Sequence, residues 1–343
     1  MQLFTRRTIR GIGALAIVCW SVTAATAETP TSRIVSAANS FLSTLDAKQR
    51  QSVLFAFDDE AQRARWSNFP VTFVRRAGVS LKELNAAQRS AAMALVSSAL
   101  SRTGLQKVEQ IMEADEVLKT NERNNPMFGK DLYYLSILGH PSETDPWMFQ
   151  FGGHHLALNI TIAGERGILT PTLTGAQPAV YTSNGKTVRP LGQESDRALA
   201  LLNALDDGQR KQAILGFHLA DLVLGPGQDG KIIQPEGLRA AAMTEKQRTM
   251  LLDLISEWAG IIHESAAAAR MAEMKADINE TWFAWSGPTT AAPGANITAY
   301  YRIQGPHLVI EYAPQRLGGD PAMHVHTMYR DPTNDYGQRL IAK

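Results

Sequence analysis

The sequence predicts an α+β protein in which a unit of helices followed by antiparallel strands occurs twice. Three observations predict this fold: related stretches recur about 160 residues apart, capped helices begin each half, and segments of alternating apolar and polar residues with tight turns end each half. Helices grouped ahead of strands favour an antiparallel sheet beside a helical layer. We therefore expect a first repeat over residues 28–175, a linker over 176–192 and a second repeat over 193–343, packed with the first. Whether the repeats share one sheet stays open.

Residues 1–27 have the pattern of a secretory signal peptide. A basic start is followed by an apolar run over residues 11–22 and by the small-residue site Ala25-Thr26-Ala27, after which cleavage is expected. The paired Arg6 and Arg7 also permit export by the twin-arginine route. Because the apolar run is too short for a membrane span, we expect a periplasmic or secreted, soluble protein.

The composition excludes several classes of function. The chain has 34 Lys and Arg against 33 Asp and Glu, and 44% of its residues are hydrophobic. Such a balance argues against disorder and against nucleic acid as the main partner. The single cysteine, Cys19, lies in the predicted signal, so the mature protein would have no disulfide and no thiolate. Any transition metal would then be bound through nitrogen, oxygen or thioether atoms.

Each repeat is expected to begin with capped helices. Asp46 lies three residues before Gln49, and Asp206 lies three residues before Gln209. This is the capping-box spacing, in which the aspartate accepts from an early helical N–H and the glutamine side chain reaches back.

A hairpin and a third strand are expected after the helices of each half. Their apolar and polar residues alternate and the connections contain glycine, as is typical of antiparallel strands. The predicted segments are strand 147–151, turn 152–153, strand 155–162 and strand 168–173 in the first half, and strand 297–303, turn 304–306, strand 307–312 and strand 323–329 in the second.

His324 and His326 are the clearest candidates for metal ligands. Alternate residues of a strand point to the same face, so both imidazoles would project together and offer two nitrogen donors. Arg330, Asp331 and Asp335 follow closely. We expect these three residues to orient the imidazoles or to hold an anionic ligand.

His154 and His155 are candidates from the first half. Neighbouring strand residues point to opposite faces, and His155 shares the more polar face with Asn159. A bulge at the preceding glycines would reverse this, so both histidines remain candidates. His307 occupies the corresponding hairpin of the second half, where it could bind a ligand or support the turn.

A site of three imidazoles without thiolates suits zinc or copper, and an open fourth position would make it catalytic. The glycine-rich stretch 225–230 matches a dinucleotide-binding pattern, but it does not follow a strand. No nucleotide or flavin is therefore expected. The alternative is a metal-free protein that binds a small ligand or an envelope partner, and whether the chain is an enzyme stays open.

Four stretches also carry a resemblance: 65–78, 151–159, 171–179 and 324–337. Their most specific parts are Gly-His-His-Leu and Arg-Asp-Pro-x-Asn-Asp-Tyr-Gly. The sequence resembles the family catalogued as domain of unknown function 3500 over nearly all of the mature chain. The resemblance implies that these stretches form one constellation, and it implies no activity.

Overall fold

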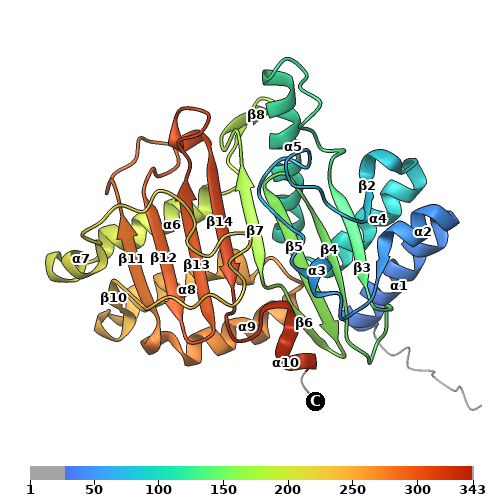
Figure 1. Cartoon of the computed structure of the whole chain (residues 1–343). Coiled ribbons are helices and arrows are strands. Elements are labelled where there is room, and N and C mark those ends of the chain that lie inside the picture. Colours follow the sequence, from blue (N-terminus) through green and yellow to red (C-terminus); the bar gives the residue numbers. More distant parts are fainter. Residues whose placement is uncertain (1–27, 342–343) are drawn as a thin grey trace, which may run out of the picture.

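The computed structural model describes residues 28–341 as a mixed α+β fold with ten α-helices and a twelve-stranded, mostly antiparallel sheet (Figure 1). The predicted signal, residues 1–27, lies outside the described residues. No helix in the described part is long and apolar enough to cross a membrane. The helices are α1 (Pro30–Thr44), α2 (Ala47–Val53), α3 (Glu60–Arg63), α4 (Ala86–Ala99), α5 (Arg102–Asn121), α6 (Gly192–Ala204), α7 (Asp207–Ala213), α8 (Glu245–Ala259), α9 (Glu264–Ala276) and α10 (Gln338–Ile341).

Strands from both predicted halves belong to one sheet. Its order is β1-β3-β4-β5-β7-β14-β13-β12-β11-β10, with β2 beside β3 and β6 beside β5, and a separate hairpin of β8 and β9. The strands are β1 (Leu54–Phe55), β2 (Val79–Ser80), β3 (Tyr134–Leu138), β4 (Trp147–Gly153), β5 (Leu156–Ala163), β6 (Arg166–Ile168), β7 (Thr172–Ala176), β8 (Tyr181–Ser183), β9 (Lys186–Val188), β10 (Leu238–Arg239), β11 (Trp282–Ser286), β12 (Tyr300–Gly305), β13 (Leu308–Pro314) and β14 (Val325–Arg330). The halves meet where β7 pairs antiparallel with β14.

The two faces of the sheet are covered differently. The longer helices pack on one face, where Phe149 and Leu158 belong to the apolar core of the first half and Val325 and Tyr329 to that of the second. In Figure 1, α6 and α8 lie behind the strands of the second half. The opposite face carries a smaller cluster that includes Met328. Because side chains alternate along a strand, His326 also projects to this second face.

Two long loops cover that second face. The first, residues 64–78, is called here the covering loop, and the second, residues 216–237 between α7 and β10, the crossing loop. In Figure 1 the crossing loop passes in front of the strands of the second half. The glycine-rich stretch 225–230 lies within it and opens no helix, as the sequence context predicted.

A buried carboxylate and a buried guanidinium hold the crossing loop against the sheet. Glu311 on β13 accepts the backbone N–H groups of Val223 and Leu224 at 2.7 and 2.8 Å. Arg330 on β14 donates to the carbonyls of Leu224 and Gly225 at 2.8 and 3.1 Å. Hydrogen bonds to charged groups are worth more than neutral ones, so these contacts fix the loop where it passes β14.

The capping boxes at Asp46 and Asp206 are present as predicted. The first hairpin turn, however, lies two residues later than expected, and the second, at residues 306–307, overlaps the predicted turn 304–306 only at Pro306. β4 extends through Gly153, which pairs with Leu156, and the turn consists of His154 and His155. In the second half Gly305 likewise pairs with Leu308. The predicted turn at 152–153 was therefore wrong, because these glycines are paired strand residues rather than turn residues.

Candidate metal centre

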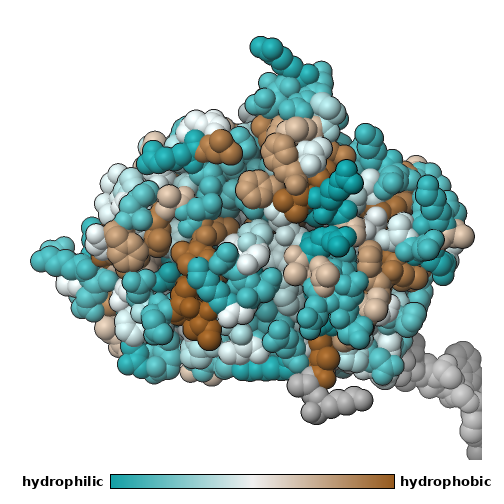
Figure 2. Space-filling view, viewed as in Figure 1, coloured by the Kyte–Doolittle hydropathy of each residue, from teal (hydrophilic) through white to brown (hydrophobic). Residues whose placement is uncertain are grey.

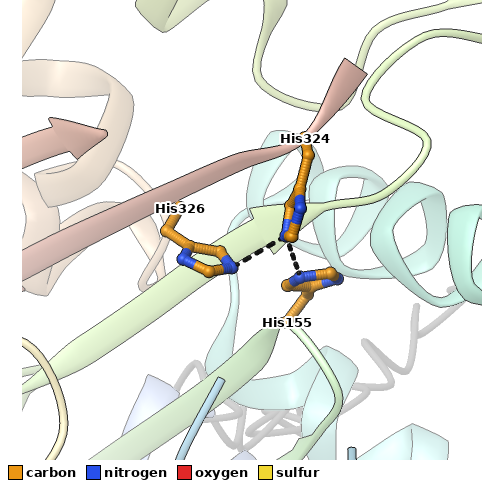
Figure 3. A group of neighbouring side chains, drawn as sticks. All are labelled: His155, His324 and His326. Carbon is orange, nitrogen blue, oxygen red and sulfur yellow. Dashed lines mark hydrogen bonds between the residues drawn. The ribbon is translucent and has the colours of Figure 1, made fainter. Parts of the chain in front are cut away.

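Three histidines converge at the seam between the two halves. His155 comes from the β4–β5 turn, His324 directly precedes β14 and His326 lies on β14. The Nε2 atom of His324 lies 3.0 Å from Nε2 of His155 and 3.0 Å from Nε2 of His326 (Figure 3). One ligand atom from each residue lies within 4.8 Å of the others. This group can hold a metal ion.

The backbone of the first half aims His155 at the other two histidines. His155 has a φ of +62°, a left-handed conformation that non-glycine residues seldom adopt outside turns. Its ring fills space beside Gly175, which pairs with His326 across β7 and β14. A Cβ on Gly175 would lie 3.1 Å from Cδ2 of His155. The missing side chain at this position therefore makes room for the ring.

All three imidazoles are buried, with exposed fractions of 2% for His155 and 5% for His324 and His326. Burial, together with the neighbouring histidines, lowers the pKa of His155 well below its usual value. Burial lowers the pKa of His324 to about 4, and it lowers that of His326 although Asp221 acts in the opposite direction. The rings are therefore neutral near pH 7, which is the form that binds metals.

The outer nitrogens of His324 and His326 have neighbours, and Nε2 of each faces the other histidines. His324 donates from Nδ1 to the carbonyl of Leu317 at 2.7 Å, which places its free lone pair on Nε2. Nδ1 of His326 lies 3.9 Å from the carboxylate of Asp221 and 3.3 Å from the side-chain amide nitrogen of Asn68. The carbonyl of Leu317 and the carboxylate of Asp221 are acceptors of the kind that usually accompany metal-binding histidines, whereas the amide nitrogen of Asn68 can only donate.

Hydrogen bonding among the three rings alone cannot satisfy their inner nitrogens, although the side-chain amide nitrogen of Asn68 lies 3.5 Å from Nε2 of His326. Nε2 of His324 has one lone pair in the plane of its ring, yet Nε2 atoms of two other rings lie 3.0 Å away. A cation would accept a lone pair from each ring. Tetrahedral zinc with bonds of about 2.0–2.1 Å separates its nitrogen ligands by about 3.3 Å. Two of the three separations, at 3.0 Å, are a few tenths of an ångström below this value, and one ligand atom from each ring lies within 4.8 Å of the others.

His154 points elsewhere. Its Nδ1 lies 2.6 Å from the buried carboxylate of Asp115 on α5, and its ring stacks on that of His155 with centroids 3.7 Å apart. Tyr133 donates to its carbonyl at 2.9 Å. Thus His155 is the histidine of this pair that joins His324 and His326, while the ring of His154 packs against the ring of His155.

The other candidate residues of the second half contact different parts of the molecule. Arg330 pairs with Asp335 at 2.8 Å and with Asp229 of the crossing loop at 2.9 Å. Asp331 pairs with Arg270 of α9 at 2.9 Å. His307 lies 2.9 Å from the hydroxyl of Thr333. These contacts tie the crossing loop, α9 and the C-terminal segment to the sheet, away from the three imidazoles.

Sequence reasoning missed three residues beside the centre, namely Asn68, Gly175 and Asp221. Asn68 lies on the covering loop, which Arg76 holds in place. One terminal nitrogen of Arg76 donates to the carbonyls of Ser67, Phe69 and Gly153 at 2.6, 2.8 and 2.9 Å. Stretches 65–78 and 171–179, which contain Asn68 and Gly175, share the family resemblance with the histidine stretches and so gave a signal for both residues. No comparable pattern marks Asp221.

Residues 27–338 match the family model described as "Protein of unknown function (DUF3500)". No curated protein matches the chain. No solved structure matches it either.

Proposed function

Because the chain belongs to the DUF3500 family, whose description states no function, we propose one from the site: the protein binds a single zinc ion. The ligands are the Nε2 atoms of His155, His324 and His326. The observation that carries the proposal is the convergence of three buried imidazoles, one ligand atom from each lying within 4.8 Å of the others. A fourth coordination position remains for water or a substrate.

Zinc is the ion that this donor set suits best. Three neutral nitrogens with an open fourth position form the arrangement of catalytic rather than structural zinc sites. Copper(II) also accepts imidazole but favours a tetragonal arrangement, whereas these rings come from a turn and from a strand at different angles. A zinc ion here would supply Lewis-acid activation of an oxygen group, so we propose a metal-dependent enzyme.

Metal analysis of the purified protein tests the proposal. Apoprotein is dialysed separately against zinc, copper(II) and manganese, because copper(II) outcompetes zinc at most nitrogen sites, and the bound metals are measured by mass spectrometry. We expect about one zinc per chain, and its loss in the His324→Ala variant. The matched control is His307→Ala, which removes a turn histidine outside the centre and should keep full zinc content.

Each outcome of this experiment is decisive. One copper per chain together with no bound zinc would overturn the choice of zinc and retain the centre. Less than about one tenth of a metal ion per chain, well below the single ion that one site requires, would overturn the proposal and leave a metal-free binding protein. Equal zinc contents in wild type and His324→Ala would place the ion elsewhere.

Cobalt(II) tests the open position separately. Four-coordinate cobalt absorbs visible light strongly, and azide changes that spectrum only if it enters the coordination shell. We expect an azide-dependent change in the wild type and no cobalt spectrum in His324→Ala. A cobalt spectrum that azide leaves unchanged would indicate a closed, structural site.

We also propose that the protein acts after export. The support is the basic and apolar pattern of residues 1–27. N-terminal sequencing of the protein recovered from its native host should begin at Glu28. A mature chain that starts at Met1 would refute export by cleavage at this site.

Finally, we propose that the two halves derive from a duplicated unit. Gly78 and Gly237 have φ values of +95° and +94°, and each directly precedes a short strand, β2 and β10. A Cβ on either glycine would lie 2.2 or 2.3 Å from a carbonyl oxygen of the neighbouring strand. Superposition of residues 28–175 on 193–341 should align these strands and the capping boxes, and failure to do so would refute duplication.

A further inference from the structure

The side-chain amide of Asn68 lies over the ring of His326. Its nitrogen is 3.3 Å from Nδ1 and 3.5 Å from Nε2 of that ring. An atom at these two distances lies above the face of the ring, because an atom in the ring plane would collide with the carbon between the two nitrogens. Asn68 is only 9% exposed. The amide is therefore a buried group next to a nitrogen that faces the proposed zinc ion.

Binding of zinc at Nε2 of His326 would leave this amide without an acceptor. A neutral imidazole carries one N–H hydrogen, so a ring that offers the lone pair of Nε2 to a metal has that hydrogen on Nδ1. Neither ring nitrogen can then accept from Asn68. Among the described residues, no other acceptor lies within hydrogen-bond distance of the amide nitrogen. A buried donor without an acceptor is costly, so a ligand that supplies one is favoured.

A ligand at the fourth coordination position can supply the acceptor. In tetrahedral zinc its coordinating atom would lie about 3.3 Å from each Nε2, and the amide nitrogen is 3.5 Å from Nε2 of His326. A carbonyl or carboxylate oxygen has two lone pairs, so it can bind the metal with one and accept from the amide with the other. The coordinating nitrogen of an imidazole has a single lone pair. The amide therefore distinguishes oxygen ligands from nitrogen ligands of this kind.

The covering loop holds the amide in place. Arg76 donates to the carbonyls of Ser67 and Phe69, on either side of Asn68, at 2.6 and 2.8 Å. The backbone carbonyl of Asn68 accepts the N–H of His155 at 3.4 Å. A donor that is fixed before the ligand arrives is suited to stabilise negative charge on an oxygen.

The amide also lies between the histidine centre and a groove. The groove has a volume of about 360 Å³ and is lined by Asn68 and Asp221, but by none of the three histidines. It lies on the loop-covered face, whose surface is largely hydrophilic with hydrophobic groups exposed among the polar ones (Figure 2). Asp221 is a carboxylate and can only accept. Of these two side chains, Asn68 is therefore the one that can donate to a ligand that enters from the groove.

We propose that Asn68 is a specificity-determining residue of the metal centre. It donates a hydrogen bond to the atom at the fourth position, so the site takes its substrate through an acceptor oxygen, that of a carbonyl or carboxylate group. The metal and the amide bind this oxygen together. The inference rests on the proposed function, because it requires a metal on the three histidines.

Two small probes on the cobalt-loaded protein test the inference: acetate, which binds through oxygen, and imidazole, which binds through nitrogen. Each is titrated while the visible cobalt spectrum is recorded. Asn68→Ala should weaken acetate by about 10-fold, the effect of one hydrogen bond to a charged group, and should leave imidazole and cobalt binding unchanged. Asn68→Leu fills a similar space without a donor and should have the same effect. The control Asn39→Ala, on the exposed side of α1, should change nothing.

The possible failures are distinguishable. An acetate affinity that is unchanged in both Asn68 variants would overturn the inference and leave the metal centre in place. Equal losses of acetate and imidazole binding would overturn it as well, because Asn68 would then only position His326. A wild-type protein that gives no cobalt spectrum would refute the proposed function, and this inference with it.

Discussion

Substitution of Gly175 by alanine should disturb the histidine centre although no histidine is replaced. The new Cβ would lie 2.8 Å from the carbonyl oxygen of Val325, and 3.1 and 3.3 Å from Cδ2 and Cβ of His155. The first distance is shorter than carbon–oxygen contacts allow. Strand β7, the His155 ring or both must therefore shift by a few tenths of an ångström.

Two effects of Gly175→Ala follow from these contacts. Overpacking of this kind costs about 1–3 kcal/mol of unfolding free energy, which corresponds to a melting temperature lower by roughly 2–4 °C per kcal/mol in a large domain. Metal–ligand distances tolerate only about 0.2 Å. A displaced His155 should therefore weaken zinc binding by about 10- to 100-fold, as loss of an orienting partner does.

Scanning calorimetry of the apoprotein and competition with a zinc-binding dye measure the two effects separately. The control is Gly216→Ala, because a Cβ there would meet no atom within 4 Å and its φ is not positive. If Gly175→Ala lowered the melting temperature but bound zinc with wild-type affinity, the reasoning that this glycine positions His155 as a ligand would be refuted.

Three further predictions concern the residues that hold the site together. Glu311→Gln places an amide against the N–H groups of the crossing loop, so it should cost about 1–3 kcal/mol and speed tryptic cleavage after Lys231; an unchanged cleavage rate would contradict this. Arg76→Met leaves carbonyls of the covering loop without their donor, and calorimetry should show a loss of about 2 kcal/mol together with weaker zinc binding. Burial raises the pKa of Asp335 to about 6, although Arg330 lowers it. Because this value exceeds that of the unfolded chain, the contribution of Asp335 to stability is greatest below about pH 4 and is lost as the pH rises toward 6. In urea unfolding, the stability difference between wild type and Asp335→Asn should vary over this interval, and a constant difference would refute the effect.

Local patterns predicted what depends on neighbours in sequence. Capping spacing located the helix starts at Asp46 and Asp206, and strand alternation placed His324 and His326 on one face. The choice of His155 over His154 depended on where the turn falls. Both glycines before it could open a turn or pair in a strand, and only packing against β5 selects the second arrangement.

Contacts between distant segments could not be predicted in the same way. Asn68 and His326 are 258 residues apart and lie on a loop and a strand that share no periodic pattern. Asp221 lies on a long irregular loop whose path is fixed by Glu311 and Arg330. Such proximity depends on the three-dimensional path of the whole chain, which a single sequence does not encode in readable form.

The last strand in the sequence takes a place at the middle of the sheet. β14 inserts between β7 and β13, more than 140 residues after β7 has been synthesised. Until then one edge of β7 is unpaired and His155 lacks His324 and His326, because a chain emerges from the ribosome from its N-terminus. An ion that needs all three rings can be captured only by a finished chain. A bound metal ion would then mark completed folding and would stabilise the pairing of β7 with β14.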